Sequence, residues 1–117
     1  MYDVKPEINA LLESIPGVTV TDAFPKGPAD TPRITFYELG NSDPLTIANE
    51  PLSDIAIQID VWHKRSTGPL AAAVDDAMNG IGFRRQMAAD IPDPSGLKRK
   101  TMRYRGVVDT RTGRVTQ

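Results

Sequence analysis

The sequence predicts an α+β fold: a mostly antiparallel sheet of four to five strands with two helices packed on one face. Three observations predict it. Residues 53–63 alternate apolar with more polar side chains, two other segments carry apolar residues at helical spacing, and a connector rich in turn-forming residues lies between two strand-like segments near the C-terminus. The expected element order is α-β-β-β-α-β-β, in one domain over residues 1–109.

The central strand is predicted over residues 53–63, which read Ser-Asp-Ile-Ala-Ile-Gln-Ile-Asp-Val-Trp-His. Gln58, Asp60 and Trp62 alternate with β-branched residues, a pattern typical of a strand with one buried and one more polar face. No proline or glycine interrupts the segment, so it can lie inside the sheet. The β-branched positions are Ile55, Ile57, Ile59 and Val61.

Two amphipathic helices are expected to cover this sheet. The first is predicted over residues 3–14, with Asp3 as N-cap and Pro6 in the first turn, and it stops at Pro16-Gly17. The second follows Gly68-Pro69 and ends at Gly80 and Gly82. Its predicted apolar stripe comprises Leu70, Ala73, Val74, Ala77, Met78 and Ile81.

The remaining strands are predicted over residues 18–24, 33–39, 83–91 and 97–109, the last two joined as a hairpin through Pro92-Asp93-Pro94-Ser95-Gly96. Residues 39–52 contain two prolines and no steady period, so we expect a projecting loop or arm there. Residues 110–117 have no apolar anchor beyond Val115 and are expected to form a flexible C-terminal tail.

The net charge of −1 hides an uneven distribution. Residues 1–63 hold three basic and ten acidic residues, a net of −7, whereas residues 64–117 hold eleven basic and five acidic residues, a net of +6. One interpretation is that the charges neutralise each other within the monomer. The other is that an acidic flank and a basic flank attract separate copies head to tail.

The composition excludes several kinds of bond, metal site and cellular environment for this chain. The absence of cysteine excludes disulfides and thiol-based metal sites, and no apolar run reaches the roughly 20 residues of a membrane span. We therefore expect a chain that folds in a cytosol-like compartment with no membrane partner. No signal-peptide pattern follows Met1.

No catalytic motif is present, so we expect neither enzymatic activity nor a cofactor. His63 is the only histidine and is interpreted as a solvated residue at a strand end. Asp75 and Asp76 are expected on the exposed side of the second helix. Asp90 and Asp93 are expected to cap a turn, and a carboxylate dyad between them is the weaker alternative.

The basic segment Lys98-Arg99-Lys100 with Arg103-Tyr104-Arg105 is the one feature suited to a polyanion. Tyr104 shares strand parity with Met102 and Val108, which favours a core position for its ring. A solvated or subunit-pairing basic face is therefore the preferred interpretation, and a small nucleic-acid-binding accessory domain is an alternative.

These residues resemble the tail-terminator, or tail-completion, proteins of long-tailed bacteriophages, which are also described as minor tail or head–tail joining proteins. The resemblance covers nearly the whole chain. It rests on the short N-terminal helix, a proline-rich approach to the strand at Arg33, the segment 57–62 followed at once by a helix, and the segment 90–97 before Arg103-Tyr104-Arg105.

The resemblance implies a virion protein of the tail–neck junction, assembled in the cytoplasm of the bacterial host. It implies a ring of identical copies, a hexamer, on the head-proximal end of the tail tube, which stops tube growth and offers a surface to the head connector. Its partners would be the tail tube protein, a head-closure protein and DNA passing through the lumen. A head-closure or connector-adaptor ring of the neck is the alternative.

From the residue pattern we expect an assembly interface in the predicted arm and on the basic strands. Arginines are the expected interface or lumen charges. The candidate interface residues are Asn41, Ser42, Asp43, Leu45, Ile47, Asn49, Glu50, Arg84, Arg85, Arg103 and Arg105.

Overall fold

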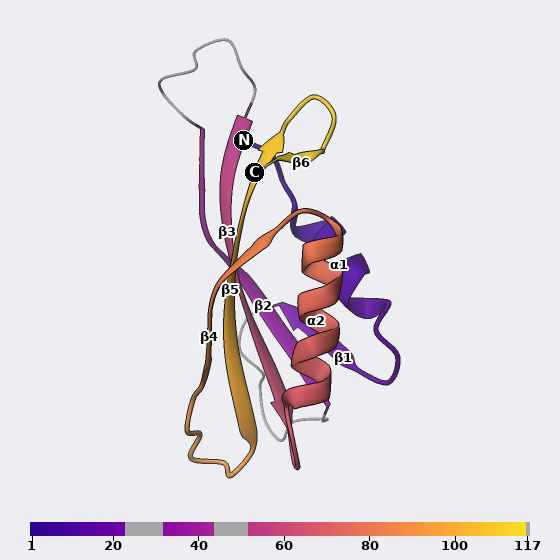
Figure 1. The fold of residues 1–117 in the computed structure, drawn as a ribbon, viewed down its shortest axis with the longest axis vertical. Helices are drawn as coiled ribbons and strands as arrows, with labels where there is room; N and C mark the ends of the chain where they lie inside the picture. The colour runs from indigo at the N-terminus through magenta and orange to yellow at the C-terminus, as the bar shows by residue number, and fades with distance from the viewer. Residues whose placement is uncertain (23–31, 44–51, 117) are drawn as a thin grey trace.

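The computed structural model describes residues 1–22, 32–43 and 52–116. It confirms the α+β class, the predicted element order and the mostly antiparallel sheet (Figure 1). The sheet order is β1-β2-β3-β5-β4, and a short additional strand, β6, pairs with β5. Both helices lie on the same face of the sheet, as predicted (Figure 1).

The sheet is built around β3 (Leu52–His63), which pairs antiparallel with β2 (Arg33–Ser42) and β5 (Lys98–Asp109). β4 (Arg84–Asp90) pairs antiparallel with the other side of β5 and forms one edge. β1 (Thr19–Asp22) pairs parallel with β2 at the other edge. Because β3 and β4 both run antiparallel to β5, they are parallel to each other, and α2 (Gly68–Gly80) connects them.

The core lies between the sheet and the helices. The predicted alternation in β3 is confirmed, because its four β-branched side chains at positions 55, 57, 59 and 61 are all fully buried. Ile8 and Leu12 of α1 (Lys5–Glu13) and Val74 and Met78 of α2 pack against this face. Tyr104 is also fully buried there, as its strand parity predicted.

The first helix starts two residues later than predicted. Val4, not Asp3, is the N-cap, and Val4 is itself buried in the core. The Asp3 carboxylate accepts a hydrogen bond from the Lys5 amide at 3.3 Å, just before the helix. Burial of Val4 therefore decides where the helix begins, while Pro6 occupies the first turn as expected.

The predicted arm over residues 39–52 is wrong at both ends. β2 continues to Ser42 through a bulge between Glu38 and Gly40, and β3 already begins at Leu52. The Asn41 side-chain amide donates a 2.7 Å hydrogen bond to the Tyr2 carbonyl and holds this end of the strand. The rest of the predicted arm, and the end of the strand predicted over 18–24, lie outside the described residues.

The predicted flexible tail is also wrong over its described part. A turn after Asp109 brings β6 (Val115–Thr116) back onto β5, with the Asp109 amide donating to the Arg114 carbonyl at 2.8 Å. Val115 packs against the core beside Phe83 and Gly106. Sequence periodicity misses this contact because Val115 is a single apolar residue.

Candidate assembly interface

The β4 edge carries two of the candidate arginines. Arg84 is exposed and points to the helix-free face, level with Arg105 of β5, whereas Arg85 is level with Tyr104 on the helix side. Arg85 lies 3.5 Å from the Asp75 carboxylate of α2, and about half of its side chain is exposed. Asp75, expected on the exposed side of the helix, instead faces the sheet and also accepts from the Tyr104 hydroxyl at 2.8 Å.

Arg103 and Arg105 lie on the helix-free face of β5 and differ in their partners. Arg105 forms a two-pronged ion pair with Asp54 of β3, with N–O distances of 2.8 and 2.5 Å. This pair holds the Asp54 pKa below its usual range, chiefly through hydrogen bonding. Arg103 is exposed, and among the described residues its side chain donates only a long 3.4 Å hydrogen bond, to the Gln58 side chain. Arg105 is therefore engaged within the monomer, and Arg103 is the more available cation.

Asn41, Ser42 and Asp43 lie at the end of β2, where Asn41 and Asp43 bind the chain's own N-terminal segment. Asp43 accepts a 2.8 Å hydrogen bond from the buried Ser53 hydroxyl, whose oxygen in turn accepts from the Tyr2 amide at 3.1 Å. The Ser53 hydrogen bond, and then the N-terminal amine, lower the pKa of Asp43. Ser42 is exposed. The four remaining candidates, Leu45, Ile47, Asn49 and Glu50, lie outside the described residues.

At the sheet edge opposite β4, β1 covers only part of β2. β1 pairs only with residues 33–36 of β2, and residues 38–42 have no strand on their outer side within the described ranges. Leu39 lies at the bulge and is 42% exposed, the largest exposure of a large apolar side chain in the described strands. Glu38 is half-buried beside it. An open strand edge of this kind is suited to pairing with another chain.

A buried polar network covers the helix-free face between these edges, and sequence analysis missed it. Asp60 is 1% exposed and accepts from the Thr101 hydroxyl at 2.5 Å and the Arg99 guanidinium at 2.9 Å. Arg99 also lies over the Trp62 ring, 4.8 Å from its centroid. The Trp62 indole donates to the Thr35 hydroxyl at 3.1 Å. The polar side of the β3 alternation is therefore a second packed surface.

The charge asymmetry is partly neutralised within the monomer. Asp54 and Asp60, from the acidic half of the sequence, pair with Arg105 and Arg99 from the basic half. The exposed Arg84 has no hydrogen-bond or ion-pair partner among the described residues. A subset of the basic residues thus remains available for contacts outside the monomer.

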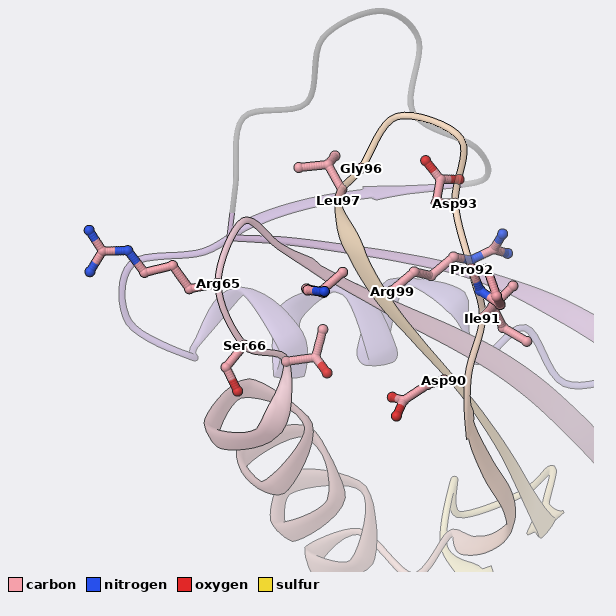
Figure 2. Close-up of a pocket in the computed structure, with 11 residues that line it drawn as sticks. Arg65, Ser66, Asp90, Ile91, Pro92, Asp93, Gly96, Leu97 and Arg99 are labelled. Atoms are coloured by element: carbon pink, nitrogen blue, oxygen red, sulfur yellow. The ribbon is translucent and has the colours of Figure 1, made fainter.

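An open hollow of about 560 Å³ lies between the start of α2 and the β4–β5 hairpin (Figure 2). Its carboxylates take separate partners: Asp90 pairs with Lys100 at 3.3 Å, and Asp93 accepts from the Ser95 amide and hydroxyl. These hydrogen bonds lower the Asp93 pKa. In Figure 2 the Arg65 side chain extends away from the other labelled residues. Asp93 therefore caps the turn as predicted, and its carboxylate is engaged by Ser95 rather than by Asp90.

His63 also has a structural role at its strand end. Its Nδ1 accepts hydrogen bonds from the amides of Arg65 and Ser66, at 2.9 and 3.3 Å. Across the described ranges, no group of three or more potential ligands could hold a metal ion. Within the same ranges, no helix is long and apolar enough to cross a membrane.

Compared with protein-family models and with curated proteins, the chain matches none.

Proposed function

We propose that this chain is a structural protein of a long-tailed bacteriophage virion. Copies of it assemble into a ring, a hexamer, at the head-proximal end of the tail tube. There the ring terminates tube growth and offers a joining surface to the head connector. The observation that carries this proposal is the open sheet: within the described residues, no strand lies beyond β4, and none lies beyond residues 38–42 of β2.

An unpaired edge exposes a row of backbone donors and acceptors that can pair with another chain. A contact between two different edges of identical copies is heterologous, and such contacts close into a ring when the rotation between neighbours allows it. The two edges differ in charge, because β4 begins with Arg84 and Arg85 whereas the open part of β2 contains Glu38. Different edges of opposite charge favour a ring over a two-fold dimer.

The helix-free face is suited to line the ring. Arg84 and Arg103 are exposed on this face and are not held by a carboxylate of the described residues. In the lumen they would lie along the path of the DNA and attract its phosphates without reading its sequence. The Asp60 network would keep this surface rigid.

Co-expression with the tail tube protein of the same genome tests the proposal. We expect short tubes that carry a ring of this chain at one end in negative-stain electron microscopy, and longer, uncapped tubes without it. Unchanged tube length with no ring would overturn the proposal. A ring that binds the connector but not the tube would replace it with the head-closure function. Salt-sensitive DNA binding by a monomer would replace it with the nucleic-acid-binding function.

A further inference from the structure

We propose that the helix-free face of the sheet holds a binding site for a phosphate-type oxyanion, formed by the guanidinium groups of Arg33 and Arg99 beside the Trp62 ring. The site lies at the end of the sheet where β2 begins. The ligand is free phosphate or a phosphate group of a nucleic-acid backbone, which offer the same chemistry to the two arginines. This inference goes beyond the ring proposed above and does not depend on it.

Arg33 is a buried cation without a counter-charge among the described residues. It is only 8% exposed, and its Nε atom is fully buried and has no hydrogen-bond partner there. Its terminal nitrogens also lack a partner among the described residues but are not fully buried, so they are open to a ligand from solution. A buried charge without a partner destabilises a fold. An anion that pairs with Arg33 therefore stabilises the folded chain.

Arg33 and Arg99 stand on either side of Trp62 in one row across the helix-free face. Arg33 of β2 is level with Trp62 of β3, and Trp62 is level with Arg99 of β5. Because neighbouring strands lie about 4.8 Å apart, the Cα atoms of the two arginines are about 10 Å from each other, a span that two long side chains can close over one small group. The Arg99 guanidinium already leans toward the middle of this row, 4.8 Å from the centre of the Trp62 ring.

Buried polar atoms without partners are concentrated around this row. The described residues contain four such side-chain atoms, and three of them are Arg33 Nε, Arg99 Nε and Thr21 Oγ1. Thr21 of β1 is level with Thr35 of β2, two residues along from Arg33 and on the same face of the sheet. Buried polar groups in folded proteins normally have partners. Three unpaired atoms in one place therefore indicate that a polar ligand binds there.

Charge and shape favour a phosphate group that carries one negative charge. Asp60 pairs with Arg99 at 2.9 Å, so the row retains one unit of positive charge, that of Arg33. A planar carboxylate matches the fork of a single guanidinium group, whereas the oxygens of a phosphate point in several directions and can accept from both arginines at once. The shared negative charge then lies between Arg33 and the donors that Asp60 leaves free on Arg99.

The fluorescence of Trp62 provides a direct test, because it is the only tryptophan of the chain. The full chain is titrated with sodium phosphate at constant ionic strength, maintained with sodium chloride. We expect a saturable change in Trp62 fluorescence. At about ten times the dissociation constant, phosphate should also raise the thermal unfolding temperature by about 5 °C. A response that chloride alone reproduces would be screening of charge and would overturn the site.

Arg33→Met removes the unpaired charge and keeps a long side chain. It should weaken phosphate binding at least about tenfold. In phosphate-free buffer it should unfold at a higher temperature than the wild type, because the uncompensated charge is gone. Arg33→Lys keeps the charge without the planar fork, should also weaken binding, and keeps the test decisive if Arg33→Met does not fold. Arg84→Met, at an exposed arginine of the same face, is the matched control and should bind phosphate as the wild type does.

Two further probes identify the source of the anion. A single-stranded DNA oligonucleotide that displaces phosphate from Trp62 assigns the site to a nucleic-acid backbone, and one that leaves phosphate binding unchanged assigns it to free phosphate. Acetate that saturates the site at the same concentration as phosphate would overturn the choice of phosphate in favour of an acidic side chain of a protein partner. Equal phosphate affinity in the wild type, Arg33→Met and Arg33→Lys would overturn the site itself.

Discussion

The Tyr104 hydroxyl of β5 donates a 2.8 Å hydrogen bond to the Asp75 carboxylate of α2. Asp75 also lies 3.5 Å from Arg85 of β4 and accepts from Asn79 at 3.2 Å within the helix. One carboxylate therefore joins the helix to both strands of the β4–β5 hairpin. This connection fixes the height of α2 above the edge that we assign to assembly.

Replacing Tyr104 with phenylalanine should destabilise the fold by about 1.5 kcal/mol, because a hydrogen bond to a charged acceptor is lost while the ring still fills the core. Urea unfolding followed by circular dichroism measures this change. Asp76→Asn, on the exposed side of the same helix, is the control and should leave the unfolding midpoint almost unchanged. Equal midpoints for Tyr104→Phe and the wild type would show that the hydrogen bond contributes nothing.

Tyr104 should also make stability depend on alkaline pH. Burial, followed by the hydrogen bond to Asp75, raises the pKa of Tyr104 above the ordinary tyrosine value of 10.0. The folded state then holds this proton more tightly than the unfolded state does, so its contribution is complete below pH 10 and declines as the pH rises further. We expect the wild type to lose stability more steeply than Tyr104→Phe above pH 10. Parallel pH profiles would contradict this.

The buried Asp60 should contribute more to stability than the exposed Asp54, although both pair with an arginine. Asp60→Ala leaves the largely buried Arg99 guanidinium without its carboxylate and should cost about 3 kcal/mol. Asp54→Ala breaks the Arg105 pair near the surface and should cost less than about 1 kcal/mol. Chemical denaturation of both variants gives the comparison. A larger loss for Asp54→Ala would mean that the helix-free face is not packed as described.

Gly106 should not tolerate a side chain, because β6 lies against it. A Cβ atom there would come within 2.9 Å of Val115 Cγ1 and 3.0 Å of the Phe83 ring. We expect Gly106→Ala to cost about 2 kcal/mol through overpacking. Gly40→Ala is the matched strand control, since a Cβ at Gly40 has nothing within 4 Å. If the two variants unfolded at the same denaturant concentration, β6 would not be packed on β5.

The sequence predicted the core face and missed the contacts made across the sheet. The alternation around Ile57 is local, so its burial could be inferred from sequence spacing alone. Asp60 lies on the face that the alternation marks only as more polar. Its burial could not be inferred, because its partners Arg99 and Thr101 are about 40 residues away and strand register cannot be read from one segment. The helical period likewise placed Asp75 off the apolar stripe without revealing that Tyr104 lies opposite it.

The sequence analysis misplaced the ends of elements where a single contact, rather than a periodic pattern, determines them. Leu39 occupies a bulge and Asn41 binds the Tyr2 carbonyl, so β2 continues through residues that usually form turns. Val115 has no periodic neighbours, yet it fills the space beside Gly106 and pairs with β5 as part of β6. Among the candidate site residues, Arg84 and Arg103 are exposed, whereas Arg105 is held by Asp54 within the monomer.

Native mass spectrometry of the wild-type chain over a concentration series is the most direct test of the central claim, that copies of this protein close into a ring through their open edges. We predict one dominant closed species of six copies, which forms as concentration rises and dissociates at high salt because charged edges contribute to the junction. A chain that remains monomeric throughout the series, or a ladder of oligomers with no preferred size, would contradict the claim.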